Sequence, residues 1–278
     1  MSWLRFVAAA LAAATPAFAA EEVPYVQTPQ PVVEAMLELA GVRGNDFLID
    51  LGSGDGRIAI TAAKKYGARG LGVEYVGSLV ALSRENARKA GVGDRVSFVE
   101  QDIYDADFSP ATVLAFYLLS DTNVELRPKM LAELRPGTRI VSHDGDMGDW
   151  DPDAQIVVPA PGKTVGVEPK STIYLWVVPA QLAGEWKTTV RLGGRATEIA
   201  LDLTQHFQAL AGVASIRGEM VGIERAYVRG PFVFMRFPHN GGTVRFEGRA
   251  AGDRIVGKVT TPDGRTLPWR ALRVSGSG

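Results

Sequence analysis

The chain of 278 residues contains no cysteine and only three histidines. Without a thiol it can form no disulfide, no thiolate zinc or iron–sulfur site and no cysteine nucleophile, so methylation of cytosine carbon through a cysteine adduct is also excluded. The three histidines, His143, His206 and His239, are too widely spaced to indicate a metal cluster. We therefore expect no bound metal.

The chain also lacks a large net charge, with 30 basic and 31 acidic residues. The charges are unevenly distributed, because residues 1–180 carry a net −7 and residues 181–278 a net +6. This division is consistent with two domains, and a basic second domain favours acidic partners. Arginines that alternate along strands would equally form a solvated sheet face.

The first 19 residues have the features of a signal peptide. Arg5 precedes an apolar run over residues 6–14, and Ala17, Phe18 and Ala19 supply the small-x-small pattern of a cleavage site. The run is shorter than the roughly 20 apolar residues that span a bilayer. We expect an exported protein of the periplasm or cell envelope, with no transmembrane segment after signal removal. An uncleaved N-terminal anchor is the alternative.

Residues 20–180 alternate between short apolar strands and amphipathic helices, which predicts an α/β fold with a doubly wound, Rossmann-like parallel sheet. The expected strands are Phe47–Leu51, Arg69–Glu74, Val96–Glu100, Thr112–Tyr117 and Thr138–Ser142. The expected helices are Val32–Ala40, Arg57–Tyr66, Ser78–Ala90 and Val124–Leu134. Two later strands, Ala154–Val158 and Thr172–Val178, have no helix between them and predict an antiparallel hairpin at the sheet edge.

Residues 181–278 contain strand candidates separated by glycine-rich turns and no helical pattern, which predicts a small antiparallel β-barrel or sandwich. The candidates are Trp186–Arg191, Glu198–Thr204, Ala209–Ile216, Met220–Val228, Phe232–Phe237, Thr243–Glu247, Arg254–Thr260 and Leu267–Val274. Trp186 and Trp269 lie near the two ends of this region, and we expect both in its core.

The segment Asp50–Arg57, with the sequence DLGSGDGR, lies between a predicted strand and a predicted helix. A glycine loop at this position lets the backbone approach a ligand and directs free amide groups of the helix toward it. The spacing is Gly-x-Gly-x-Gly, and Asp50 stands two residues before the first glycine. A carboxylate there repels phosphates and attracts a cationic amino-acid group, such as that of S-adenosylmethionine (SAM).

Two further acids follow the next two strands. Glu74 ends the second strand, where a carboxylate can accept both ribose hydroxyls, and Asp102 follows the third, in position for the adenine amino group. Either acid alone would as readily be a solvated loop residue or a helix cap. Together with the loop they predict a cofactor site formed by Asp50, Gly52, Ser53, Gly54, Gly56, Glu74 and Asp102.

These residues resemble the first three motifs of class I (seven-stranded) SAM-dependent methyltransferases. A narrower resemblance, to the small protein-lysine methyltransferases of the ATP synthase c-subunit methyltransferase type and distantly to the Dot1 type, rests on five segments. They are Tyr25–Pro29, Val33–Leu37, Asp50–Arg57, Phe116–Leu119 and Gly137–His143. The resemblance implies SAM as cofactor, a protein lysine as methyl acceptor and no nucleic-acid partner.

The chain departs from this family in its export signal and in its C-terminal β domain, which the minimal enzymes lack. Because SAM is made in the cytoplasm, an exported enzyme would need to carry or find its cofactor. The alternative function is therefore an exported, non-catalytic binding protein that keeps the methyltransferase fold as a scaffold and recognises its partner through the basic β domain.

Methyl transfer is an in-line displacement that requires alignment and a neutral nucleophile. We expect Tyr117, at the end of the fourth strand, to orient the amine as the catalytic residue, although a packed core aromatic is an equal alternative. Tyr25 and Thr28, on the N-terminal arm, are expected to close over the cofactor.

A hydrolase relay within Ser142–Asp144 is excluded, because adjacent strand residues point to opposite faces. The sequence does not indicate the oligomeric state.

Overall fold

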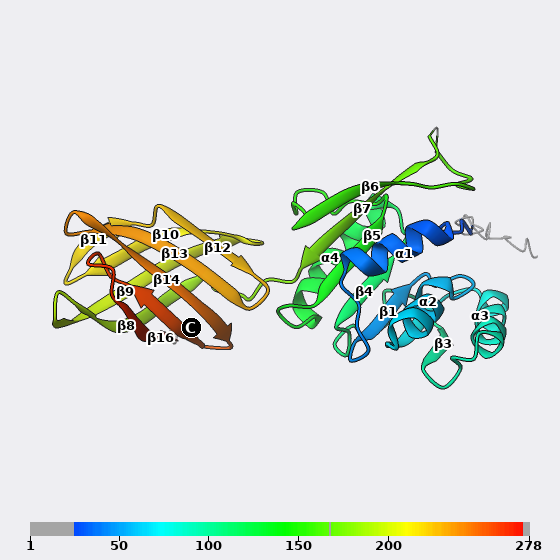
Figure 1. The fold of residues 1–278 in the computed structure, drawn as a ribbon, viewed down its shortest axis with the longest axis horizontal. Helices are drawn as coiled ribbons and strands as arrows, with labels where there is room; N and C mark the ends of the chain where they lie inside the picture. The colour runs from blue at the N-terminus through cyan, green and yellow to red at the C-terminus, as the bar shows by residue number, and fades with distance from the viewer. Residues whose placement is uncertain (1–24, 167, 275–278) are drawn as a thin grey trace, which may run out of the picture.

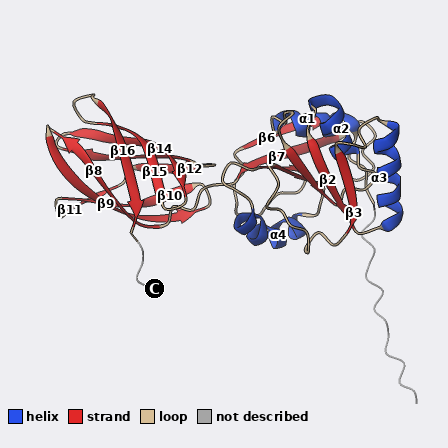
Figure 2. Ribbon diagram, turned by 90° about the horizontal axis from the view of Figure 1, so that it is seen from below, coloured by secondary structure: helices blue, strands red, loops and turns tan. Residues whose placement is uncertain are grey.

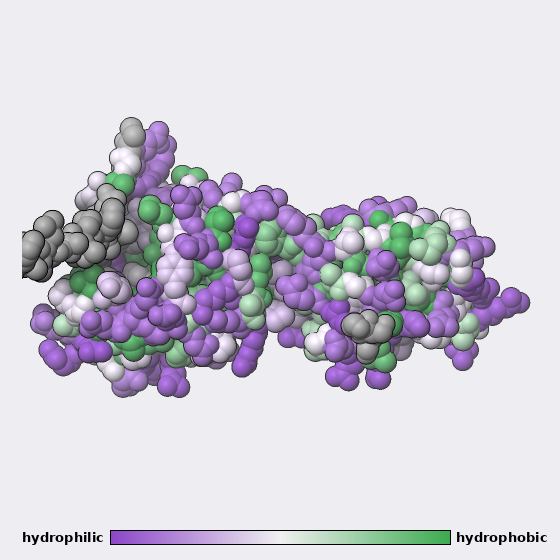
Figure 3. Space-filling model, turned by 180° about the vertical axis from the view of Figure 1, so that it is seen from behind, coloured by the Kyte–Doolittle hydropathy of each residue, from purple (hydrophilic) through white to green (hydrophobic). Residues whose placement is uncertain are grey.

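The computed structural model describes residues 25–166 and 168–274, so the predicted signal peptide, residues 1–19, lies outside the described residues. Figure 1 shows two domains, each with its own β-sheet. On the face of the molecule drawn in Figure 3, hydrophilic residues predominate over both domains. None of the helices in the described part of the chain is long and apolar enough to cross a membrane.

The first domain contains a seven-stranded sheet with the order β3-β2-β1-β4-β5-β7-β6. Its strands are β1 (Phe47–Leu51), β2 (Arg69–Glu74), β3 (Val96–Glu100), β4 (Val113–Phe116), β5 (Arg139–His143), β6 (Ala154–Pro159) and β7 (Lys170–Val177). The first five are parallel, whereas β7 runs antiparallel to β5 and β6 antiparallel to β7. The predicted parallel sheet with an antiparallel edge hairpin is confirmed.

Helices cover both faces of this sheet (Figure 2). They are α1 (Gln30–Leu39), α2 (Arg57–Tyr66), α3 (Gly77–Lys89) and α4 (Ser120–Glu133). Successive strand residues point to opposite faces, so Leu48 packs in the cluster under α1 and α2, whereas its neighbour Ile49 packs in the cluster under α4. Burial on both faces explains the continuous apolar strands of the sequence.

Apart from the start of α4, the helix and strand bounds in this domain lie within two residues of the prediction, and two of the differences bear on the site. Helix α4 begins at Ser120 rather than at Val124. The sequence pattern missed its first turn because this turn is polar and has no apolar period. Asn123 in this turn is buried and donates a 3.1 Å hydrogen bond to the carbonyl of Asp146. Strand β4 ends at Phe116, so Tyr117 lies just beyond the strand rather than within it.

The second domain is a closed antiparallel β-barrel. Its strands are β8 (Gly184–Leu192), β9 (Arg195–His206), β10 (Ala209–Ile216), β11 (Glu219–Gly222), β12 (Arg225–Arg229), β13 (Phe232–His239), β14 (Gly242–Ala251), β15 (Arg254–Thr260) and β16 (Thr266–Arg273). The order β10-β12-β13-β14-β15-β16-β8-β9 closes through the pairing of β9 with β10, and β11 pairs with β10 outside this ring. The barrel alternative of the prediction is confirmed.

The predicted strand Met220–Val228 is wrong as a single strand. Strand β11 pairs with the end of β10, whereas β12 pairs with the start of β10. Between these two strands the chain leaves the sheet at Ile223 and Glu224. Trp186 and Trp269 are 0% and 3% exposed, which confirms their place in the core. Each indole N–H donates to a backbone carbonyl, as a buried indole requires.

The two domains contact each other through Trp150 and the turn between β9 and β10. The indole N–H of Trp150 donates to Oε1 of Gln208 at 2.9 Å, and Nε2 of Gln208 donates to the carbonyl of Asp151 at 2.7 Å. The rings of Trp150 and Phe207 stack with centroids 5.3 Å apart. Trp150 is 1% exposed. This contact accounts for a buried tryptophan at the end of the seven-stranded sheet.

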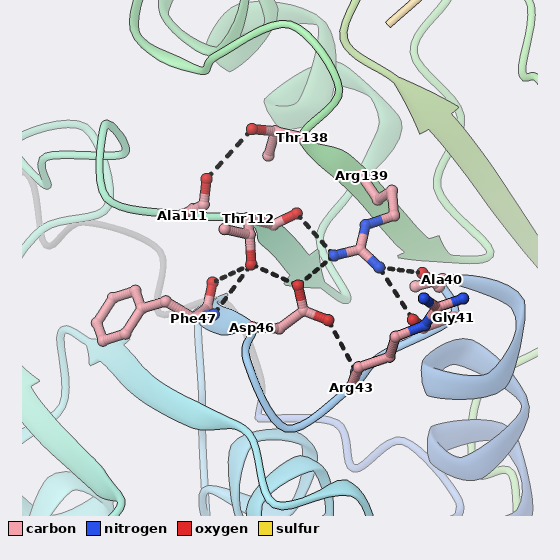
Figure 4. Close-up of polar contacts among 9 residues, drawn as sticks. All are labelled: Ala40, Gly41, Arg43, Asp46, Phe47, Ala111, Thr112, Thr138 and Arg139. Carbon is pink, nitrogen blue, oxygen red and sulfur yellow. Dashed lines mark hydrogen bonds and ion pairs between the residues drawn. The ribbon is translucent and has the colours of Figure 1, made fainter.

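A partly buried ion pair lies at the amino-terminal edge of the seven-stranded sheet (Figure 4). Arg139 of β5 pairs with Asp46, which precedes β1. Asp46 also accepts a 2.8 Å hydrogen bond from the hydroxyl of Thr112, next to β4. Nη1 of Arg139 donates to the carbonyls of Ala40 and Gly41, at 2.9 and 3.0 Å, after α1. One guanidinium therefore connects three strands and a helix end.

Replacing Arg139 by methionine is expected to lower the free energy of unfolding by about 2 kcal/mol, because Asp46 would remain 7% exposed without a cation. The effect should be below the full cost of a broken buried pair, since the Arg139 side chain is 24% exposed. Urea unfolding measures it. The control is Arg135→Met, at an exposed position, which should change stability by less than about 0.5 kcal/mol. Equal midpoints for both variants would contradict a structural role of the pair.

Candidate active site

The glycine loop between β1 and α2 is held by strand β2. The backbone N–H groups of Gly52 and Ser53 donate to the carbonyl of Val73 at 2.9 and 3.0 Å. The N–H of Gly54 donates to Oε2 of Glu74 at 2.8 Å. The structure thus brings Glu74, the predicted ribose acceptor, against the loop, where it is 7% exposed.

The conformation of the loop requires glycine at three positions. Gly52, Gly54 and Gly56 have φ angles of +68°, +54° and +80°, a region that disfavours other residues. A Cβ atom at Gly54 would lie 2.3 Å from the ring of Tyr25, and one at Gly56 would lie 2.6 Å from the ring of Phe98. The glycines therefore let aromatic rings approach the backbone, as well as giving the loop its turn.

Asp50 lies in β1 immediately under the loop and is 1% exposed. Its Oδ2 has no hydrogen-bond partner within the described residues, and neither has the buried hydroxyl of Ser53. Burial raises the pKa of Asp50 well above its ordinary value, and the charges of Asp55 and Glu74 add to this increase. The backbone N–H of Ala59, in the first turn of α2, opposes it. A buried, unpartnered carboxyl oxygen is costly until a donor or a cation reaches it.

Tyr25 lies over the glycine loop. Its ring packs on Gly54, and its hydroxyl accepts a 3.2 Å hydrogen bond from the backbone N–H of Asp55. The side chain remains 43% exposed, and burial of the hydroxyl raises its pKa, so the phenol stays protonated at neutral pH. The arm that carries Tyr25 therefore covers the loop from the solvent side.

Thr28 fixes the same arm to the end of β5. Its hydroxyl lies 3.1 Å from Nδ1 of His143, and its carbonyl accepts a 2.8 Å hydrogen bond from Nη1 of Arg57. Arg57 also pairs with Asp55 of the glycine loop at 2.6 Å. No role was predicted for Arg57 or His143 from the sequence, although both lie in segments on which the resemblance to the lysine methyltransferases rests.

Tyr117 and His143 meet at the carboxyl ends of β4 and β5. Their ring centroids are 3.8 Å apart at an interplanar angle of 33°. Burial lowers the pKa of His143 to about 4, with the nearby charge of Asp144 opposing this shift, so the imidazole is neutral at physiological pH. Burial raises the pKa of Tyr117, with a smaller contribution from Asp144. Tyr117, which is half-buried, therefore presents an uncharged aromatic ring at this edge, and the neutral imidazole of the buried His143 lies behind it.

Ser171 and Asp144 both contact His143 without forming a hydrolase relay. The hydroxyl of Ser171 and Oδ2 of Asp144 lie 2.7 and 3.3 Å from the same nitrogen, Nε2. A relay needs the nucleophile and the acid on opposite nitrogens, with the nucleophile accessible. His143 is 0% and Ser171 2% exposed. This cluster is therefore structural.

Asp102 lies outside the buried part of the site. It follows β3 and is exposed, and its Oδ1 accepts a 3.0 Å hydrogen bond from the backbone N–H of Tyr104 within the same turn. The backbone N–H of Gln101 donates to the carbonyl of Glu74 at 2.9 Å, so Asp102 stands at the strand end next to Glu74. The structure records no contact between its side chain and the glycine loop.

The aspartates that follow β5 make contacts within the protein. Asp144 pairs with Lys163 at 2.6 Å, and Asp149 pairs with Arg127. Asp153 accepts a 2.7 Å hydrogen bond from the backbone N–H of Val177. Within residues 25–166 and 168–274 no group of three acidic or histidine side chains is arranged to hold a metal ion.

The chain matches known proteins over its first domain. A family model described as the ANTKMT methyltransferase domain matches residues 50–154. A protein-lysine N-methyltransferase of Saccharolobus islandicus is 41% identical over 157 residues, which are 56% of this chain and 94% of that protein. The human lysine N-methyltransferase of the ATP synthase c-subunit is 31% identical over 139 residues, or 50% of this chain and 59% of that protein.

Among solved structures, an RNA methyltransferase from Salinibacter ruber in complex with S-adenosyl-L-homocysteine is 49% identical, with a TM-score of 0.51 over 56% of this chain and 96% of that one. The unpartnered oxygen of Asp50 and the glycine loop fit the cationic amino-acid group of the corresponding methyl donor, so SAM is the cofactor. The chain is a SAM-dependent enzyme and belongs to the protein-lysine N-methyltransferase family.

Proposed function

We propose that this enzyme transfers the methyl group of SAM to the ε-amine of a lysine in a protein substrate. The observation that carries the proposal is the acidic character of the carboxyl edge of the sheet. Asp102, Asp121 and Asp146, which follow β3, β4 and β5, are exposed and form no ion pair within the described residues, whereas Arg57 and Lys163 are each paired with an aspartate. Such an edge attracts a cationic lysine and repels a nucleic-acid backbone. The name of the S. islandicus relative supports the same acceptor.

The residues have separate roles in this proposal. Bound SAM supplies an electrophilic methyl group on a sulfonium. Asp50 would hold the ammonium group of the cofactor, and Glu74 would accept hydrogen bonds from its ribose hydroxyls. The acceptor amine must lose a proton before it attacks, and the uncharged ring of Tyr117, stacked on the neutral His143, favours the neutral amine. The protonated phenol of Tyr117 orients that amine through its hydroxyl oxygen.

The acceptor can be tested with methyl-labelled SAM and two probes, casein and total tRNA. We expect label in casein, recovered as Nε-methyl-lysine by mass spectrometry of the hydrolysate, and none in the RNA. Casein with fully acetylated lysines, whose amide nitrogens are not nucleophilic, is the control and should take up no label. Label in RNA without label in protein would overturn the lysine proposal. No label in either probe, together with no SAM binding in calorimetry, would instead favour the non-catalytic binding protein.

We also propose that the protein is exported to the periplasm or cell envelope. The support is the sequence pattern of residues 1–19. Fractionation of cells, with mass analysis of the N-terminus, tests this. A mature chain that begins at residue 20 in the envelope fraction is expected. An intact Met1 in the cytoplasmic fraction would contradict it, and an intact Met1 in the membrane fraction would indicate an uncleaved anchor.

A further inference from the structure

A groove crosses the outside of the barrel over strands β12 to β15, in the domain that lies outside the residues matched by the methyltransferase family model. Its volume is about 460 Å³, within the range of small-ligand sites. The side chains that line it are Arg225, Phe234, Arg236, Thr243, Arg245 and Thr260. Three of these six are arginines and two are threonines, so the lining offers many hydrogen-bond donors.

The three arginines form a row in direct cross-strand register. Arg225 of β12 lies opposite Arg236 of β13, and Arg236 lies opposite Arg245 of β14. Like charges directly opposite each other destabilise a sheet. Since neighbouring strands are about 4.8 Å apart, the row spans about 10 Å. Because this arrangement lowers the stability of the domain, it suggests that a bound anionic ligand offsets the repulsion between the arginines.

The acidic residues nearby neutralise the row only in part. Glu224 lies 3.5 Å from Arg236, and Glu247 lies 3.8 Å from Arg245. Glu247 also pairs with Lys258 at 2.9 Å. All of these side chains are substantially exposed, so the pairs contribute little. Arg225 makes no recorded ion pair within the described residues, and the patch keeps an excess of positive charge.

The base of the groove is aromatic. Phe234 is half-buried and stacks on Tyr227 with ring centroids 5.2 Å apart and an interplanar angle of 18°. Arg225 lies 5.7 Å from the centroid of the Tyr227 ring. The interior of the barrel is filled, with Phe237 and Phe246 both 0% exposed. A ligand of this domain would therefore bind on the outer face, where the Tyr227 ring restricts the position of Arg225.

We propose that this groove binds a small oligophosphate, that is, a ligand with two or three linked phosphate groups. Guanidinium groups match phosphate oxygens bidentately, and a row of three suits a linear anion better than a single phosphate. The threonine hydroxyls at Thr243 and Thr260 supply further donors. The limited volume favours a small ligand over a polymer. The proposal is independent of the methyl acceptor.

The test is calorimetric titration of the full chain with sodium tripolyphosphate at 50 and 200 mM NaCl. We expect binding that weakens at the higher salt and that falls at least 10-fold in Arg236→Gln, the centre of the row. Arg254→Gln is the matched control, because Arg254 is exposed on β15, does not line the groove and changes the net charge equally. If Arg236→Gln lowers the melting temperature, Arg225→Gln replaces it. Methyl transfer should be unchanged in all three variants.

Three results would overturn the proposal. The first is no binding of tripolyphosphate. The second is an equal loss in the variants of Arg236 and Arg254, which would indicate general surface charge. The third is that the protein binds only a single-stranded RNA oligonucleotide, or only vesicles with phosphatidylglycerol, and that tripolyphosphate does not displace this ligand.

Discussion

Replacing Asp50 by asparagine is expected to weaken SAM binding about 100-fold while making the cofactor-free protein more stable. The loss follows from removing a charged hydrogen-bond acceptor from the cationic group of the cofactor, an interaction typically of about 1.5–3 kcal/mol. The gain follows from the burial of Asp50, which is 1% exposed and has an unpartnered Oδ2. Calorimetry with SAM and urea unfolding without it measure the two effects.

The pH dependence of the stability provides a second measurement. The folded protein raises the pKa of Asp50 well above its ordinary value, so it binds this proton more tightly than the unfolded chain does. Stability from this source is fully present below the ordinary aspartate pKa of about 3.9 and is lost as the pH rises through the folded pKa. Asparagine cannot ionise. The stability advantage of the variant over the parent should therefore grow with pH across this interval.

The matched control for this experiment is Asp94→Asn. Asp94 is exposed and has no ion pair in the described structure, so its amide variant should bind SAM and unfold as the parent does. SAM binding by the parent should also release protons, which appears as a dependence of the binding enthalpy on the buffer. If the Asp50 variant binds SAM with the affinity of the parent, the assignment of this carboxylate to the cofactor is wrong.

The sequence predicted the sheet of the first domain well, because its strands and helices end at unambiguous residues. Helix α2 has the predicted bounds, since Gly56 precedes it and Gly67 ends it in the left-handed conformation. Strands β2 and β3 are likewise as predicted. Helix α4 was misplaced by four residues because the local signal is polar and its first turn is fixed by the tertiary contact of Asn123. The division of β11 from β12 also depends on pairing with β10, which no local pattern indicates.

The residues of the candidate site were likewise predictable from the sequence only in part. Asp50, the glycines and Glu74 could be found because one loop and one adjacent strand place them together. The contacts of Thr28 with His143, and of His143 with Tyr117, join residues separated by 115 and 26 positions, and no local pattern indicates that these residues meet. The complete burial of His143 could be known only from the fold.

Replacing Tyr117 by alanine is expected to lower kcat for methyl transfer about 100-fold and leave the SAM affinity within a factor of about two. The ring stacks on His143 at 3.8 Å beside the site, and misplacement of an acceptor by about 1 Å costs a factor of this size. Tyr117→Phe keeps the ring and removes the hydroxyl, so it separates orientation by the hydroxyl from packing. Initial rates with labelled SAM and casein, and calorimetry for the cofactor, measure both quantities.

His143→Gln tests the support beneath that ring, and we expect it to lower kcat about 10-fold because the stack is lost while Tyr117 keeps its hydroxyl. Because burial lowers the pKa of His143 to about 4, the parent should show no change in rate near pH 6.5, where an exposed histidine titrates. An inflection there that disappears in His143→Gln would show that the imidazole takes part in proton transfer.

A Tyr117→Ala variant with the kcat of the parent would show that Tyr117 only fills space and that the amine is oriented by another group.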